Sequence, residues 1–283
     1  MEIAGLQNIS SFTLLKSPIS IEQLIGSAKK RGYKAIALTD INFTYGLIDF
    51  YKIAKSEGIK PLLGMQLRIN GLINENQNFD LIVIAKNNVG YQNIMRLSSA
   101  VNLITENGKK EIDVTLNKLQ KYLGNLHIIT TANQHSELRD LFYHNFDLMP
   151  DYIRKLEKIL PQSSNLYLGV FADKSESNYI NSVKSLSEQF NLKLVAVEDV
   201  QYIDPHDIFL QEVLKSIDDN QSIRDGYELT LKHVGNHYLK TKDKLCESYN
   251  SLGILEALRN TKQVSDDSNI EIKFTMPQLP KFI

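Results

Sequence analysis

The sequence predicts an α/β protein built as a distorted seven-stranded (β/α) barrel, resembling a TIM barrel, with a helical extension at its C-terminal end. Two observations support this prediction. Short β-rich runs alternate with helical patterns along most of the chain, and the strand signals stop after residue 205. Such alternation is typical of repeated strand–helix units that form a parallel sheet, and barrel closure accommodates seven such strands better than an open two-layer sheet.

Composition is that of an ordinary globular protein. The chain has 283 residues, of which 42% are hydrophobic and 23% charged, so it can bury a large core. Its formal net charge of -1 gives no global attraction to nucleic acid or to membranes. A single cysteine, Cys246, excludes an internal disulfide, and the sequence shows neither a leader pattern nor a membrane-spanning apolar run. These features predict a cytoplasmic protein.

The first strand–helix units set the pattern. Residues 20–31 carry apolar side chains at helical spacing, namely Ile21, Leu24, Ile25 and Ala28. We expect Ser20 to cap the start of this helix and Gly32 to end it. The run KAIALT, residues 34–39, predicts a strand buried on both faces, and residues 45–58 repeat the helical spacing.

The rest of the chain continues this alternation. With a first strand near residues 3–9, the further strand predictions bring the total to seven: 61–69, 80–86, 126–132, 165–172 and 193–199. Helical patterns lie between most of them, at 90–103, 114–123, 136–145, 150–160 and 176–190, and later at 205–219 and 242–265. The predicted organisation is a barrel core over 1–204, a helical continuation of the same domain over 205–270, and a linker over 271–283.

Catalytic side chains of (β/α) barrels lie at the C-terminal ends of the strands. At these ends the sequence places Gln7, Ile9, Asp40, Ile41, Gln66, Asp199 and Gln201. A divalent metal centre needs several imidazole, carboxylate or thiolate ligands that converge on one point, whereas amides are weak ligands and isoleucine is none. The six histidines form no HxH or HExxH pair, and for each a surface or capping role is expected: His127, His135, His144, His206, His233 and His237. The sequence therefore predicts no catalytic residue.

Four stretches carry a family resemblance. Residues 10–67, from SSFTLLKSPIS through KAIALTDINFTYG to GIKPLLGMQL, resemble the opening of the polymerase-and-histidinol-phosphatase (PHP) domain of bacterial DNA polymerase III alpha subunits. The block IAKNNVGYQNIMRLSS is similar to that family's LAKNxxGYxNLxxLxS, and VAVEDVQYIDPHD to its VATNDVHYxxxxD. The ending MPQLPKFI resembles the segment that leads into the polymerase palm. The resemblance covers nearly the whole chain.

The resemblance also implies where a metal centre would lie. Family members that keep one use ligands from the HxH, LLDG, TDH, GxE and NDVH motifs, with a histidine in the fourth strand and a cysteine or similar residue after the fifth. Carried across, these positions fall on Gln7, Ile9, Lys16, Ile41, Gln66, Asp80, Ala132 or Asn133, Asp199 and Gln201. Only Asp199 keeps its type, and Lys16 puts a cation where a ligand carboxylate belonged. We therefore expect neither a metal nor another cofactor in this chain, whereas the parent polymerase would use Mg²⁺.

Each of two aspartates has two possible roles. Asp40 is either a surviving ligand or a carboxylate that hydrogen-bonds backbone N–H groups in the turn that follows it. Asp199, the family ligand retained in kind, is either structural or keeps a residual role in organising a cation or water.

The resemblance implies the N-terminal PHP domain of a replicative DNA polymerase, a nucleotidyltransferase of DNA replication. The domain itself would be non-catalytic and would support the polymerase palm and thumb of the parent chain, with a proofreading exonuclease subunit or other replisome proteins as further partners, contacting DNA only indirectly and no membrane. The alternative is a metal-dependent phosphoesterase or 3′–5′ exonuclease with an altered ligand set around Asp80, Asp199 and Asp40. A third hypothesis is a free-standing inactive barrel that serves as an interaction protein.

Overall fold

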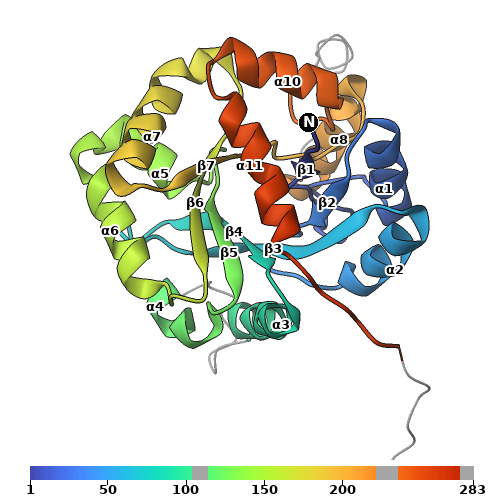
Figure 1. Cartoon of the computed structure of the whole chain (residues 1–283), viewed down its shortest axis with the longest axis horizontal. Helices are drawn as coiled ribbons and strands as arrows, with labels where there is room; N and C mark the ends of the chain where they lie inside the picture. The colour runs from blue at the N-terminus through green and yellow to red at the C-terminus, as the bar shows by residue number, and fades with distance from the viewer. Residues whose placement is uncertain (104–113, 221–234, 275–283) are drawn as a thin grey trace, which may run out of the picture.

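The computed structural model of the chain describes residues 1–103, 114–220 and 235–274 (Figure 1). Seven strands form one sheet in sequence order, which confirms the predicted number and placement of strands. They are β1 (Ala4–Gly5), β2 (Ala35–Leu38), β3 (Lys60–Asn70), β4 (Asn78–Ala85), β5 (Leu126–Thr130), β6 (Asn165–Val170) and β7 (Lys193–Ala196).

One strand runs against the others, so the expectation of a parallel sheet is wrong at β4. The pairs β3–β4 and β4–β5 are antiparallel, whereas the other four neighbouring pairs are parallel. The reason is the short connection between β3 and β4, residues 71–77, in which Gly71 N donates to Gln77 O at 2.9 Å. A connection of this length cannot hold a crossover helix, so the chain must return beside the strand that it has just left.

The sheet curls until its two edges meet. Asn8, just after β1, forms a parallel bridge with Val200, just after β7. Ile9 N donates to Val200 O at 3.1 Å, and Val200 N donates to Gln7 O at 3.0 Å. An apolar cluster fills the interior of this barrel: Ala4, Leu6, Ala35, Ala37, Leu62, Ile82, Ile84, Ile129, Tyr167, Val195, Val197 and Val264.

Helices pack around the outside of the barrel and bury a second, larger apolar cluster. They are α1 (Ile21–Lys30), α2 (Leu47–Glu57), α3 (Asn88–Asn102), α4 (Leu116–Leu119) followed by the 3₁₀ turn η1 (Gln120–Tyr122), α5 (Glu137–His144), α6 (Met149–Ile159) and α7 (Ser177–Phe190). The predicted cap at Ser20 is confirmed, since its side chain accepts from Gln23 N and the Gln23 side chain accepts from Ser20 N.

After the last strand, the described residues form the helices α8 (Ile208–Asp218), α10 (Lys242–Ser251) and α11 (Leu255–Asp266). The predicted helix over 242–265 is two helices, because Gly253 adopts a left-handed φ of 66° between them. Helix α11 lies across the barrel where the strands begin (Figure 1). Thr261 Oγ1 accepts from Ala4 N at 3.1 Å, and Val264 belongs to the interior cluster. This end of the barrel is therefore closed. Residues 275–283 of the predicted linker lie outside the described residues.

Candidate functional site

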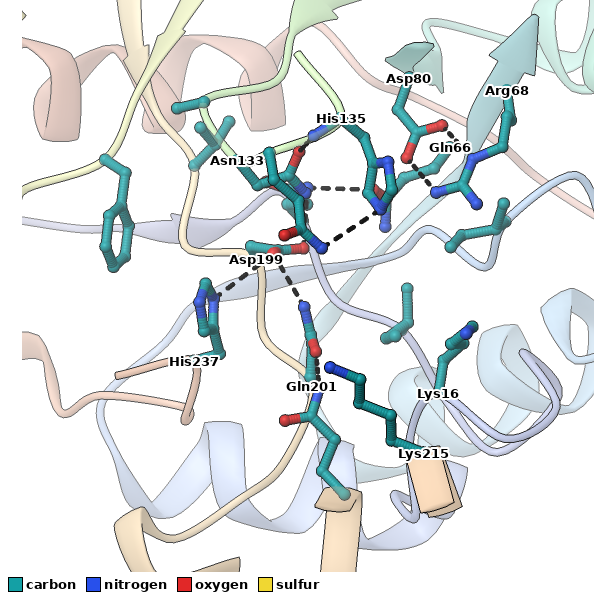
Figure 2. Close-up of a pocket in the computed structure, with 18 of the residues that line it drawn as sticks. Lys16, Gln66, Arg68, Asp80, Asn133, His135, Asp199, Gln201, Lys215 and His237 are labelled. Atoms are coloured by element: carbon teal, nitrogen blue, oxygen red, sulfur yellow. Dashed lines mark hydrogen bonds and ion pairs between the residues drawn. The ribbon is translucent and has the colours of Figure 1, made fainter. Parts of the chain in front are cut away.

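The opposite end of the barrel, where most strands end, holds a cavity of about 630 Å³ (Figure 2). Every position that the family motifs assign to a metal centre lies in its lining: Gln7, Ile9, Lys16, Ile41, Gln66, Asp80, Ala132, Asn133, Asp199 and Gln201. These residues come from six strands or from the loops that directly follow them. The sequence positions that the motifs pick out thus converge on one place.

Asp199 lies within a chain of amide side chains. Gln7 Nε2 donates to Asp199 Oδ1 at 3.1 Å and Gln201 Nε2 donates to Asp199 Oδ2 at 2.9 Å. His237 Nδ1 lies 3.4 Å from the same Oδ2 (Figure 2). The chain extends through Gln7 Nε2 to Gln66 Oε1 at 3.0 Å. Amide N–H groups therefore satisfy both oxygens of the one carboxylate that keeps its family type.

The backbone of Asp199 is unusual as well. Its φ of 46° lies in the left-handed region, which residues other than glycine rarely adopt. The residue is 8% exposed. Asp199 is thus held in a strained backbone conformation, and its carboxylate accepts hydrogen bonds from the amides of Gln7 and Gln201.

Asp80 is paired with an arginine that the sequence analysis did not single out. Arg68 Nε donates to Asp80 Oδ1 at 2.7 Å and its terminal nitrogen donates to Asp80 Oδ2 at 2.8 Å. The two residues face each other across the antiparallel β3–β4 pair. Arg68 follows Gln66 by two positions, so both side chains point to the same face of β3. That spacing was a usable signal, but the expected parallel sheet hid the contact with Asp80.

Asp40 does not line the cavity. Its carboxylate is 2% exposed and accepts from Ser10 N at 2.7 Å, Ser10 Oγ at 2.8 Å and Thr13 Oγ1 at 2.7 Å. Burial raises the pKa of this carboxyl above its ordinary value, although these hydrogen bonds favour the charged form. Asp40 is therefore a turn-shaping residue, but the loop that it fixes is 10–13, before it in sequence, and not the turn that follows it.

Lys16 forms its ion pair with a residue outside the family ligand positions. Its Nζ pairs with Asp218 of α8 at 2.7 Å, and both side chains are more than a third exposed. This contact links the loop after β1 to the helix that borders the cavity. A second lysine of the lining, Lys215, also comes from α8 (Figure 2).

The expected surface or capping role is wrong for His127, which is fully buried in β5. His135 and His237 line the cavity, and the His237 side chain is 39% exposed. Burial, reinforced by the charge of Arg68, lowers the pKa of His135, although Asp80 and Asp199 act in the opposite direction. His144 pairs with Asp140 on an exposed helix surface, as expected. His233 lies outside the described residues.

The side chains present do not fit the divalent metal centre that the resemblance assigns to other family members. Among residues 1–103, 114–220 and 235–274, no group of three or more His, Cys, Asp or Glu side chains is placed to hold a metal ion. Both oxygens of Asp80 are engaged by Arg68, and amides engage both oxygens of Asp199. The remaining positions hold glutamine, isoleucine, lysine, and alanine or asparagine, which offer weak ligands or none.

Comparison with known proteins agrees with this architecture. The family model described as "PHP domain" matches residues 6–173, more than half of the chain. The chain belongs to the PHP domain family.

Relatives of this PHP domain are alpha subunits of DNA polymerase III. The chain is 27% identical over 285 residues to that subunit of Halalkalibacterium halodurans, with 100% of the chain and 24% of the relative covered. Identity is 26% over 283 residues for Bacillus subtilis, with coverage of 100% and 24%, and 25% over 275 residues for Escherichia coli K12, with coverage of 96% and 23%. The chain thus spans about a quarter of the length of the curated relatives that it matches.

Solved structures show the same fold at low identity. An amidohydrolase from Chromobacterium violaceum matches with a TM-score of 0.50 and 11% identity, covering 70% of this chain and 87% of that one. A proposed metal-dependent phosphoesterase from Bifidobacterium adolescentis matches with a TM-score of 0.50 and 9% identity, covering 88% and 96%. Within the described part of the chain, no helix combines the length and apolarity needed to cross a membrane.

Proposed function

We propose that this chain is the PHP domain of a bacterial replicative DNA polymerase III alpha subunit and that it acts there as a non-catalytic scaffold in the cytoplasm. The observation that carries the proposal is the alignment of the whole chain with the N-terminal quarter of such subunits. The DNA-directed polymerase activity, and the Mg²⁺ that it uses, would belong to the remaining three quarters of the parent protein.

The geometry of the cavity supports a structural role. Metal-assisted hydrolysis of a phosphoester needs a cation that activates water and stabilises the charge that develops on the phosphate. The carboxylates that would hold such an ion, Asp80 and Asp199, are already bonded to Arg68 and to amide side chains. Their contacts tie β1, β3, β4 and the segment after β7 together at the open end of the barrel. In this proposal, the residues at the family ligand positions stabilise the fold.

The polymerase palm and thumb are the proposed partners, together with a proofreading exonuclease subunit or other replisome proteins. The last described residues support a defined exit of the chain beside α2. Ile272 N donates to Tyr51 Oη at 3.2 Å, and Lys52 Nζ lies 4.8 Å from the centre of the Phe274 ring. The segment that would lead toward the palm is therefore anchored on α2, and DNA contact by this domain would be indirect.

Extending the gene sequence past Ile283 tests the assignment directly. We expect the reading frame to continue into a polymerase domain, and we expect the longer protein, but not the 283-residue chain, to extend a primer. A stop codon directly after Ile283, together with the absence of a polymerase partner in pull-downs, would instead favour the free-standing interaction protein.

The rival function is a metal-dependent phosphoesterase or 3′–5′ exonuclease. The observation in its favour is that the cavity stays open and keeps Asp199 beside His237, at 3.4 Å. Elemental analysis discriminates between the two functions. Stoichiometric zinc or manganese retained through purification and lost in Asp199→Ala, with hydrolysis of a phosphoester that is lost in the same variant, would establish the rival.

A further inference from the structure

Among the described residues, four cationic side chains line the cavity, Lys16, Arg68, Arg139 and Lys215, and Arg68 is the one whose ion pair is with a family ligand position, Asp80. The Arg68 guanidinium forms two parallel hydrogen bonds with Asp80, at 2.7 and 2.8 Å, which is the bidentate geometry of the strongest ion pairs. The Asp80 side chain is 1% exposed and that of Arg68 is 22% exposed. The pair therefore lies mostly out of water, where its electrostatic interaction is weakly screened.

The position of the Arg68 guanidinium is set by the backbone on both sides of the ion pair. The β3–β4 register sets Arg68 opposite Asp80, and Arg68 N donates to Asn42 Oδ1 at 2.8 Å. Asp80 N in turn donates to His135 O at 2.8 Å, and Asp80 O accepts from Thr131 Oγ1 at 3.2 Å. Both partners are thus fixed through their backbones by neighbouring strands and loops.

The charge of Arg68 also acts on the second carboxylate. Burial lowers the pKa of Arg68, but the hydrogen bonds and charge of Asp80, with a contribution from Asp199, outweigh burial and raise it. One guanidinium is thus stabilised by the two acidic residues that occupy family ligand positions. Asp199 additionally receives amide donors from Gln7 and Gln201.

We propose that the Arg68 guanidinium is the resident cation of this cavity and takes the electrostatic place of the divalent ion, so that the site is complete without metal. A divalent ion at Asp80 would have to displace two charge-assisted hydrogen bonds and would lie beside a fixed positive charge. The inference concerns the cavity alone and does not depend on whether the chain is joined to a polymerase.

This proposal predicts that the single and the double variants differ in how their stability responds to metal ions. Removing Arg68 alone leaves Asp80 as a buried carboxylate without a counter-ion, which is destabilising and creates an affinity for cations. Removing both charges leaves no unpaired carboxylate and therefore no affinity for cations. Metal sensitivity should therefore appear in Arg68→Met, be absent from the wild type, and disappear again in the double variant Arg68→Met/Asp80→Asn.

Thermal unfolding of the full chain tests this in three buffers, containing EDTA, MnCl₂ or MgCl₂. We expect the wild-type Tm to be the same in all three. We expect Arg68→Met to unfold roughly 5–10 °C lower in EDTA and to regain part of the difference in MnCl₂. The double variant should be more stable than Arg68→Met and should not respond to either metal. Arg154→Met, which removes an exposed ion pair with Asp151, is the matched control and should change little.

Arg68→Lys keeps the test informative if Arg68→Met does not fold. Lysine retains the charge but loses the two-pronged geometry, so we expect a smaller loss of stability and still no response to manganese. A saturable rise of the wild-type Tm with MnCl₂ would overturn the proposal. So would an Arg68→Lys variant whose Tm rises in MnCl₂ by as much as the substitution lowered it. An Arg68→Met variant that folds as stably as the wild type would also overturn it.

Discussion

The two ends of the barrel are stabilised in different ways. At the end where the strands begin, helix α11 inserts Val264 into the apolar interior and adds hydrogen bonds at its edge, such as that between Ala4 N and Thr261 Oγ1. At the end where most strands stop, charged and polar side chains surround a cavity of about 630 Å³, and the Arg68–Asp80 ion pair is the least exposed of the pairs among them. The closed end thus excludes charge from the apolar interior, whereas the open end contains charged side chains and a buried ion pair, Arg68 with Asp80.

The largest effect is expected from a charge placed at the closed end. Val264→Asp would put a carboxylate among the side chains of the barrel interior, where no cation lies within the apolar cluster. Burial of an unpaired charge should destabilise the fold by more than about 4 kcal/mol. Chemical denaturation followed by circular dichroism measures this. Arg259→Asp, on the exposed side of the same helix, should cost far less, and equal losses in the two variants would refute the description of a closed apolar end.

A buried ion pair that follows β7 but lies outside the cavity lining should respond to the loss of a single charge and tolerate the loss of both. Lys240 is 3% exposed, and its Nζ donates to Glu198 Oε2 at 2.6 Å, while Tyr249 Oη donates to Glu198 Oε1 at 2.7 Å. Lys240→Met should cost about 3–5 kcal/mol of unfolding free energy, because the carboxylate is left without its cation.

The double variant Lys240→Met/Glu198→Gln is the control for this pair. It removes both charges and should recover much of the loss, since the glutamine can still accept from Tyr249. A double variant that is as unstable as the sum of the two single variants would show that the pair contributes through packing and not through its charges.

A pH-dependent effect distinguishes the interior from the cavity. Burial, with a smaller contribution from the charge of Lys86, lowers the pKa of His127 from 6.5 to about 4. The unfolded chain therefore takes up a proton at this residue at higher pH than the folded chain does. The stability that neutral His127 provides is complete above about pH 6.5 and is lost as the pH falls toward 4.

The expected size is roughly 2 kcal/mol between pH 7 and pH 5, from the linkage between the two pKa values. Urea unfolding at both pH values, in the wild type and in His127→Phe, isolates this contribution. The variant should show a shallower loss of stability on acidification. Identical slopes in wild type and His127→Phe would contradict the assignment.

The sequence predicted the framework of the fold better than its local direction. Alternating apolar runs located all seven strands, because buried strands and amphipathic helices leave distinct periodicities. The reversal of β4 was missed, although residues 71–77 are too short for a helix, because strand direction is set by connections and not by composition.

The site divides in the same way. Motif positions located the cavity lining, from Gln7 to Gln201, because each motif ends at a strand terminus. Contacts between distant segments were out of reach: Arg68 with Asp80 depends on an antiparallel register, and His237 meets Asp199 from 38 positions further along the sequence. No periodicity encodes such meetings, and only the packed structure brings these side chains together.

The smallest expected effect comes from a second cation of the cavity lining, Lys16, and sharpens the comparison within the open end. Lys16 and Asp218 are 47% and 39% exposed in their side chains, so water screens their pair at 2.7 Å. Lys16→Met should change the unfolding free energy by no more than about 1 kcal/mol and should leave the chain indifferent to manganese, because Arg68 still occupies Asp80. The measurement is the same thermal unfolding in EDTA and MnCl₂. If Lys16→Met alone made the Tm rise with manganese, then Lys16, and not Arg68, would be the charge that keeps a divalent ion out of this cavity.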